Sequence, residues 1–194
     1  LLKTLRTLES ELRADVHLQP LELHPAIGSD GVNRNSHLRQ LQPLQRSGPQ
    51  PCWADIQLHG MAVGLDMGAN EDRMLYNTLD AHRLLQWAHS HGPHNQLDLA
   101  LGMARAYFTH YAHIADHQVL VDLAAAAGLD RNQALAYLAS GQDAQAVREA
   151  ESFYRGMGIQ TAPTFMFNHR QLLRGCQTPE GFARALRHVA PTGA

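Results

Sequence analysis

The sequence predicts an α/β fold in which the two ends of the chain build a small sheet and a large all-helical domain is inserted between them. Apolar runs of strand length occur near the ends, at residues 15–23 and 164–174, whereas the residues between them carry a series of helical stripes. Because one hairpin alone does not make a stable sheet, we expect the strand at 15–23 to join the hairpin at 164–174, together with a further strand.

Composition narrows the class of protein. The chain has 194 residues, 44% of them hydrophobic, which is enough for the core of one domain that carries a large insertion. The formal net charge is −2, no basic stripe is present and no apolar run reaches the length of a membrane span. We therefore expect neither nucleic acid nor a membrane as a partner.

Cysteine usage bears on the cellular compartment. The two cysteines, Cys52 and Cys176, form neither a C-x-x-C nor a zinc-ribbon spacing. Such low usage is typical of a reducing compartment, so we expect a cytoplasmic protein, and a Cys52–Cys176 disulfide stays open as an alternative.

The first fifty residues predict one helix, one strand and a long connection. Leucines recur at helical spacing at positions 1, 5, 8 and 12, and Ala14-Asp15 closes that helix. Alternating residues from Asp15 to Leu23 predict a short strand that Pro25 stops. Residues 24–52 are rich in turn-forming residues and predict a connection with one helix near Arg34–Leu44.

Helical signals follow in series. Asn77 or Thr78 can cap a helix that runs to about His91, where Gly92-Pro93 ends it. Further helices are predicted by apolar stripes and capping aspartates: Leu97 to Tyr111, Val119 to Ala124 closed by Gly128, a short helix capped by Asp130, and a helix capped by Asp143 that carries Val147, Ala150 and Tyr154.

The pattern changes to strands after Pro163. Thr164–Phe167 and Gln171–Arg174 are predicted to form a hairpin around a turn at 168–170, and Thr178-Pro179-Glu180 opens a last helix. If Asn168 and Gln171 flank the turn, the register places Thr164 opposite Gly175, which would put Cys176 beside Pro163.

Pro163 is the most site-like feature of the chain. A proline at the first residue of a strand donates nothing to the ladder and leaves the neighbouring backbone open to a ligand. We therefore expect Ala162, Pro163 and Thr164 to form an edge on which an extended peptide or a thiol substrate docks. An X-Pro bond at such a corner can be cis.

Several short motifs, taken together and in this order, resemble the DsbA-like thioredoxin family, and specifically its FrnE-like branch. The segments that carry the resemblance are Pro20-Leu21-Glu22-Leu23-His24-Pro25, Asn77-Thr78-Leu79-Asp80-Ala81-His82-Arg83-Leu84, Ala106-Tyr107-Phe108 with Ile114-Ala115-Asp116, Ala162-Pro163-Thr164-Phe165 and Gly175-Cys176-Gln177. The last departs from the family's usual Gly-Ala-Gln.

The resemblance implies a thioredoxin-like fold with a large all-helical insertion domain. Residues 1–25 and 159–194 would form the thioredoxin-like domain, and residues 33–157 the insertion. It also implies a cis bond at Pro163. Family members begin with a strand and a Cys-Pro-x-Cys motif at the start of the first helix, so we expect both to lie upstream of Leu1 or to be lost.

Cys176 is the candidate catalytic thiol within the chain, either as a third thiol near an active pair or as a solitary reactive one. The alternative is that it fills the place of an alanine, because free cysteine packs as a small hydrophobe.

The polar candidates in the insertion are Asn77, His82 and Arg83. In one interpretation their helix covers the active site and supplies polar contacts to the substrate. In the other, Asn77 caps the helix and Arg83 is exposed.

The thirteen histidines raise the question of a metal site. His110, His113 and His117 form one group at helical spacing, and residues 89, 91 and 94 form a second. Asp116 has the pattern of an N-cap that separates His113 from His117, and no cysteine or second carboxylate completes either group at ligand spacing. We expect no metal.

The expected function is thiol–disulfide exchange of the DsbA/FrnE type through a mixed disulfide, without a dissociable cofactor, on a protein or small thiol or disulfide substrate. One alternative is a glutathione-dependent isomerase or transferase similar to 2-hydroxychromene-2-carboxylate isomerase, with glutathione docked at the cis-proline edge. Another is a degenerate binding module that has lost its thiols. A homodimer is compatible with each.

Overall fold

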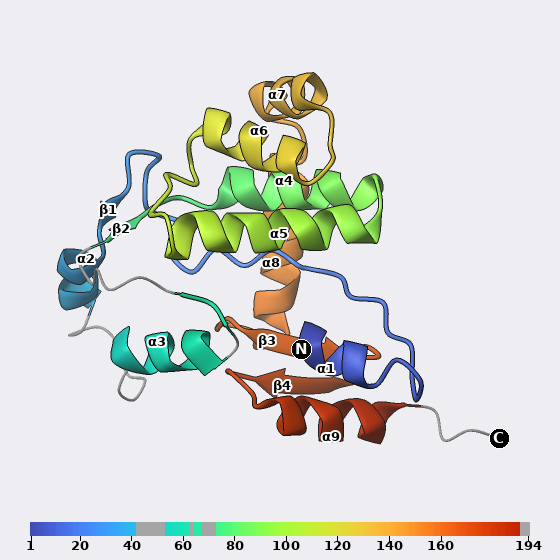
Figure 1. The fold of residues 1–194 in the computed structure, drawn as a ribbon. Coiled ribbons are helices and arrows are strands. Elements are labelled where there is room, and N and C mark those ends of the chain that lie inside the picture. Colours follow the sequence, from blue (N-terminus) through green and yellow to red (C-terminus); the bar gives the residue numbers. More distant parts are fainter. Residues whose placement is uncertain (42–52, 63, 67–72, 191–194) are drawn as a thin grey trace. The chain divides into compact units, whose positions relative to one another are not determined.

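The computed structural model describes residues 1–41, 53–62, 64–66 and 73–190 (Figure 1). The chain divides into two compact units, one of Leu1–Val16 with Tyr154–Ala194 and one of His17–Phe153. We call the first the terminal unit and the second the helical unit. The predicted domain bounds at residues 25, 33, 157 and 159 remain a proposal; the compact units differ from them in grouping residues 17–25 with the helices.

Four helices build the core of the helical unit: α4 (Leu79–Ser90), α5 (Pro93–Phe108), α6 (His117–Ala126) and α7 (Arg131–Ser140). Helix α4 contacts α5, α6 and α7, and it runs alongside α5 in Figure 1. Burial of one apolar stripe from each helix is the main favourable term. The buried core comprises Ala81, Leu84, Ala88, Leu99, Met103, Leu120, Val121, Ala124, Leu129, Ala134, Tyr137 and Leu138.

Side-chain caps fix where two of these helices begin. The carboxylate of Asp116 accepts the backbone N–H of Gln118, and that of Asp130 accepts the N–H of Gln133. The expected Asp143 cap is not observed. Asp143 has a φ of 62°, and its carboxylate accepts the Tyr137 hydroxyl instead.

Three elements of the helical unit were not predicted, namely β1 (Val32–Asn33), β2 (Met74–Leu75) and α3 (Trp53–Ala62). The strands pair antiparallel, with Val32 opposite Leu75. At Gly31, which has a φ of 76°, a Cβ atom would lie 2.6 Å from the Leu75 carbonyl oxygen, so glycine permits this approach. Two-residue strands carry too little alternation to be visible in the sequence.

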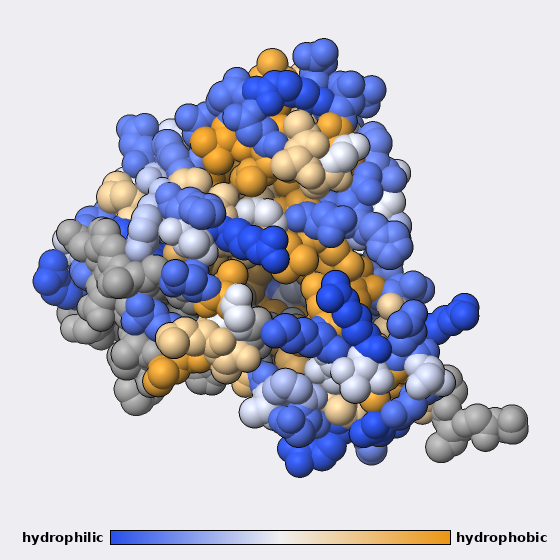
Figure 2. Space-filling model, viewed as in Figure 1, coloured by the Kyte–Doolittle hydropathy of each residue, from blue (hydrophilic) through white to orange (hydrophobic). Residues whose placement is uncertain are grey.

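Two further helices complete this part of the chain. Helix α2 (Arg34–Leu41) lies where the connection was expected to hold a helix. Helix α8 (Ala144–Gly156) begins in the helical unit, and its last three residues belong to the terminal unit. Figure 2 shows hydrophobic residues between hydrophilic ones on the displayed face, and the exposed large apolar residues of the helical unit include Leu58, Met61 and Leu135.

The terminal unit contains α1 (Leu2–Thr7), β3 (Thr164–Phe167), β4 (Gln171–Arg174) and α9 (Pro179–Val189). Helix α1 contacts α9, and the Thr4 hydroxyl donates to the Pro179 carbonyl at 3.4 Å. Arg187 donates two hydrogen bonds of 2.8 Å to the carboxylate of Glu11. Helix α1 is shorter than the leucine stripe predicted, although Leu8 beyond its end is still buried.

The predicted strand at 15–23 is wrong. None of its residues joins a ladder, and side chains of the helical unit hold its backbone instead. Gln96 accepts the N–H of Leu18 at 3.0 Å and donates to its carbonyl at 3.1 Å. The N–H of Glu22 donates to the Glu151 carboxylate. The alternation that resembled a strand therefore reflects an extended segment, residues 17–23, which we call the strap.

The predicted hairpin is confirmed, but its register is wrong by one residue. Thr164 lies opposite Arg174, and Phe167 lies opposite Gln171. The turn holds Asn168 and His169 at positive φ, and the Arg170 N–H donates to the Phe167 carbonyl. The predicted register took Asn168 as a strand residue that flanks the turn. In the structure Asn168 lies in the turn, so the loop holds residues 168–170 and the pairing shifts by one residue.

Candidate functional site

The candidate site in the terminal unit is the chain segment that leads into β3. The Ala162–Pro163 peptide bond is cis, and both residues are exposed. The Pro163 carbonyl accepts the N–H of Gly175 at 2.8 Å, which fixes this corner to the far end of the hairpin. The Thr164 hydroxyl donates to the Thr161 carbonyl at 2.6 Å and closes the loop around the proline.

Ala162 is the residue of this corner whose backbone is free. Its N–H and carbonyl make no hydrogen bond to any residue that the structure describes. Backbone groups that are exposed and unpaired at a strand end are a template for an added extended peptide. The three residues predicted to form the edge, Ala162, Pro163 and Thr164, are therefore contiguous, and one of them offers unused backbone groups.

Cys176 is a free, exposed thiol two residues beyond the end of β4. Because the register is shifted, Gly175 rather than Cys176 pairs with Pro163. The thiol nevertheless follows directly on the residue bonded to the proline, so it belongs to the same corner of the terminal unit. Cys52 and the predicted loop around it lie outside the described residues.

Asn77 uses its side-chain amide within the helical unit. Its oxygen accepts the N–H of Leu79 at 2.9 Å at the start of α4, and its nitrogen donates to the Ile27 carbonyl at 3.0 Å. The interpretation of Asn77 as a cap of this helix agrees with these contacts, and both polar atoms of the amide are engaged.

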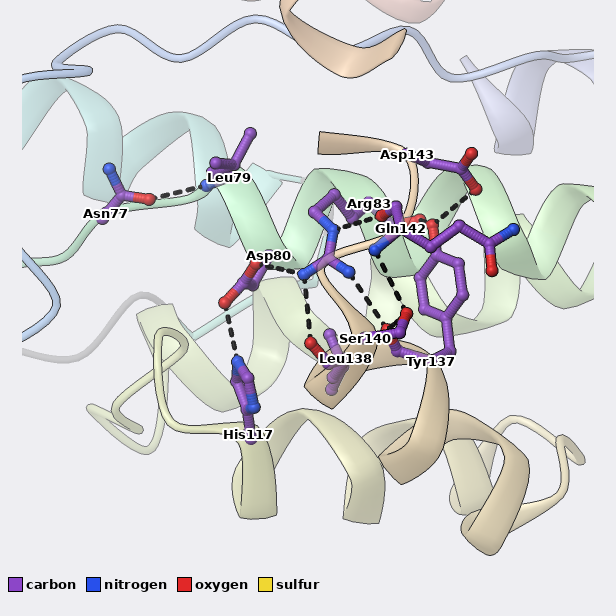
Figure 3. A network of polar contacts seen from close by, with 10 residues as sticks. All are labelled: Asn77, Leu79, Asp80, Arg83, His117, Tyr137, Leu138, Ser140, Gln142 and Asp143. Carbon is purple, nitrogen blue, oxygen red and sulfur yellow. Dashed lines mark hydrogen bonds and ion pairs between the residues drawn. The ribbon is translucent and has the colours of Figure 1, made fainter. Parts of the chain in front are cut away.

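Arg83 is buried, with only 2% of its surface exposed, so the interpretation as an exposed arginine is wrong. Its guanidinium donates to the carbonyls of Tyr137, Leu138 and Gln142 and to the carboxylate of Asp80 (Figure 3). The carbonyls at the end of a helix have no partner within that helix. Arg83 on α4 supplies partners to the C-terminal end of α7 and thereby joins the two helices.

The carboxylate of Asp80 completes this network, since it also accepts from His117 at 2.7 Å (Figure 3). Burial raises the pKa of Asp80, but the hydrogen bonds and charges from His117 and Arg83 outweigh that effect and hold the pKa below its ordinary value. Arg83 is therefore paired as well as buried. The Nε, Nη1 and Nη2 atoms of Arg83 all donate hydrogen bonds within the helical unit, so its polar contacts serve the fold.

His82 is the third candidate, and it lies on α4 against the strap. Burial lowers the pKa of His82, while the negative charge of Glu151 and a hydrogen bond to the backbone of Leu21 oppose that change. His82 also lines a small cavity in the helical unit.

The described residues hold no group of three or more His, Cys, Asp or Glu side chains placed to bind a metal ion. Over the same part of the chain, no helix combines the length and the apolar character that crossing a membrane requires.

The model of one protein family, the DSBA-like thioredoxin domain, matches residues 2–187. The chain belongs to this family. Among solved structures, a probable DsbA oxidoreductase from Streptomyces coelicolor is similar, with 26% sequence identity and a TM-score of 0.74. The match covers 91% of this chain and 75% of that one. A search of curated proteins found no match.

Membership of the DSBA-like family confirms the predicted thioredoxin-like fold with a helical insertion. It also supports chemistry of the thiol–disulfide oxidoreductase type at the level of the family. The wrong strand at 15–23 does not weaken this assignment, because the family match extends over nearly the whole chain.

Two residues that organise the helical unit were missed in the sequence. Gln96 and Glu151 are buried polar residues that hold the strap, at 3% and 6% exposure. The sequence carried a signal for both residues, namely a polar residue on the apolar face of a helix. Gln96 lies three residues before buried Leu99, and Glu151 lies four after buried Val147, so each occupies the apolar face of its own helix.

Proposed function

We propose that this member of the DSBA-like family is a thiol–disulfide oxidoreductase that docks an extended substrate on the Ala162–Thr164 edge. The observation that supports it most directly is the unused, exposed backbone of Ala162 beside Pro163. A substrate strand paired there would hold its cysteine at a fixed distance from the corner, because backbone hydrogen bonds set the register of an added strand.

The proposed reaction is dithiol–disulfide exchange. A thiolate of the protein attacks one sulfur of a substrate disulfide, a mixed disulfide forms, and the other substrate sulfur leaves as a thiolate. A second thiolate of the protein then attacks the mixed disulfide, which releases the reduced substrate and leaves the protein oxidised. No dissociable cofactor takes part in either step.

Which thiols of the protein react is also part of the proposal. Residues 1–194 contain no C-x-x-C motif, and the family resemblance implied a Cys-Pro-x-Cys pair that either lies upstream of Leu1 or has been lost. Within the described residues the candidate thiol is Cys176, which is exposed and adjacent to the residue that bonds Pro163. We assign no substrate contact to Asn77 or Arg83, whose polar atoms are engaged, and retain His82 as a candidate.

The test is the reduction of insulin disulfides by the full-length protein, with dithiothreitol as the terminal reductant. Accelerated precipitation of the insulin B chain is the expected result. A matched assay with glutathione and a small disulfide distinguishes the glutathione-dependent alternative, in which activity would depend on glutathione. If the protein shows no activity in either assay, the proposal is wrong and the degenerate binding module is the better hypothesis. We keep the cytoplasm as the proposed compartment.

A further inference from the structure

His24 and His37 bring two imidazole nitrogens together in the helical unit. The Nε2 atom of His37 lies 3.3 Å from the Nδ1 atom of His24, and the two rings meet edge-on at an angle of 89°. The residues are 13 positions apart in the sequence, so the fold and not a local spacing makes the pair. Neither residue belongs to the two histidine groups that the sequence singled out, at 110–117 and 89–94.

Both histidines stand on backbone that other contacts fix. His24 begins a turn in which its carbonyl accepts the N–H of Ile27 at 3.1 Å, and Ile27 is buried. His37 is the fourth residue of α2, and the side chain of Asn33 caps this helix by accepting the N–H of Ser36 at 2.9 Å. The two nitrogens are therefore positioned before a ligand arrives, which reduces the entropy lost on binding.

The contact between the two rings is poor as a hydrogen bond. Its 3.3 Å exceeds the usual donor–acceptor distance for an N–H donor. The ring centroids are 4.8 Å apart, closer than they would be if both centroids and both nitrogens lay on one line. At least one nitrogen is therefore aimed away from the other. Little stability is lost when a better partner replaces this contact.

The separation of the two nitrogens matches the coordination geometry of zinc. A zinc ion binds imidazole nitrogens at about 2.0–2.1 Å in a tetrahedral arrangement, which places two such ligands about 3.3–3.4 Å apart. In the tautomers of His24 and His37 that carry hydrogen on the outer nitrogens, both facing nitrogens offer a lone pair. Imidazole is a preferred ligand of zinc and of its neighbours in the transition series, whereas Mg²⁺ and Ca²⁺ prefer oxygen.

The surroundings of the pair favour the form of imidazole that binds a metal ion, which is the neutral one. Burial lowers the pKa of His24, and the charge of His37 lowers it further. Both side chains are still partly exposed, so water can reach an ion held between them.

We propose that His24 and His37 bind one divalent transition-metal ion of the zinc type through Nδ1 and Nε2, respectively, with water or a small external ligand in its remaining positions. Because the described residues provide no group of three His, Cys, Asp or Glu side chains for a metal, they predict an open, exchangeable site and not a structural zinc centre. The ion would join the turn that follows the strap to α2. The site lies within the helical unit and is independent of the proposed oxidoreductase activity.

The experiment is a titration of the full-length protein with ZnCl₂, followed by NMR of the histidine ring Cε1–H signals. Thiols are first blocked with iodoacetamide, so that thiolates do not compete for the metal. We expect the signals of His24 and His37 to shift together and to saturate, while that of the exposed His94 on α5 stays unchanged. MgCl₂ at the same concentrations should shift neither signal, because Mg²⁺ prefers oxygen ligands.

Two substitutions test whether the rings act together. His24→Gln and His37→Gln each leave a single imidazole. The dissociation constant for Zn²⁺, read at the remaining histidine, should then rise at least about tenfold, because the second ligand of a chelate binds at a high effective concentration. The matched His94→Gln should leave this constant unchanged. Shifts that never saturate, a response of one ring without the other, or an unchanged dissociation constant in either variant would each overturn the proposal.

Discussion

Arg83 illustrates how one side chain fixes the packing of two helices. It is 2% exposed, yet its donors reach three carbonyls near the end of α7 and the Asp80 carboxylate. A buried charge is tolerated when it is paired and its hydrogen bonds are satisfied. Removing it leaves the partner groups buried without a hydrogen bond or an opposite charge. The residue that the sequence offered as a substrate contact therefore acts as a structural connection.

Substitution of Arg83 should change the stability of the protein by a measurable amount. Arg83→Met keeps much of the apolar stem and removes every donor, so we expect the free energy of unfolding to fall by about 3 kcal/mol. Urea denaturation of the full-length protein measures it. Arg148→Met, an exposed arginine on α8, is the matched control and should change the value by less than about 0.5 kcal/mol. Equal effects of the two substitutions would contradict the role of Arg83.

Cys176 offers a second test at this scale. Because the thiol is free and exposed, iodoacetamide should alkylate it in the folded protein. Peptide mapping by mass spectrometry identifies the modified cysteine. Labelling of Cys176 only after denaturation would mean that the side chain is buried, as expected for a residue that merely fills the place of an alanine.

At the scale of elements, the strap shows why alternation misled the strand prediction. Residues 17–23 are extended and alternate in character, but Gln96 and Glu151 satisfy backbone groups that a strand would satisfy through a neighbour. A glutamine amide, with one acceptor and two donors, reproduces the pattern of a peptide group. The extended segment is thereby held on helices without a sheet.

The amide of Gln96 should control the local stability of the strap. In Gln96→Leu, the amide hydrogen of Leu18 loses its acceptor, and its exchange with solvent should speed up by about tenfold. Hydrogen exchange followed by NMR gives this rate. Gln145→Leu, at an exposed site on α8, provides the control and should leave Leu18 unchanged. Unchanged exchange in Gln96→Leu would show that the strap is held by other contacts.

The burial of His82 against the strap should make the stability of the protein depend on pH. Burial holds the pKa of His82 below its ordinary value of 6.5, so the unfolded chain binds the proton more tightly than the folded one. The contribution of neutral His82 is present above pH 6.5 and is lost as the pH falls from there toward the lower folded pKa. Below the folded pKa it levels off.

Comparison with His82→Gln isolates this contribution. Between neutral pH and mild acid, the free energy of unfolding should fall more for the wild-type protein than for the variant. Urea denaturation at a series of pH values measures both curves. Parallel curves would mean that His82 titrates alike in the folded and unfolded chains.

At the scale of the whole molecule, the chain joins a helical unit to a terminal unit that carries the hairpin and the proline corner. The family match spans both, from residue 2 to residue 187. The proposed chemistry belongs to the terminal unit, whereas the helical unit contributes its own core.

The sequence predicted the helical block and the hairpin well, because long apolar stripes and caps such as Asp116 and Asp130 are local signals. It failed where non-local contacts decide. The strap is extended because of Gln96, far along the chain, and the two-residue strands β1 and β2 depend on each other. Within the site, the sequence predicted the corner formed by Ala162, Pro163 and Thr164. It did not predict the register of the hairpin, because the register depends on the positive φ angles of Asn168 and His169 in the turn.

The most direct test of the central claim is to trap the mixed disulfide between the full-length protein and a cysteine-containing peptide and to map it by mass spectrometry and NMR. The account predicts a peptide linked to a protein thiol, together with shifts of the Ala162 and Thr164 amide signals as the peptide pairs with that edge. A linked peptide that leaves both signals unchanged, or the absence of any linked peptide, would contradict it.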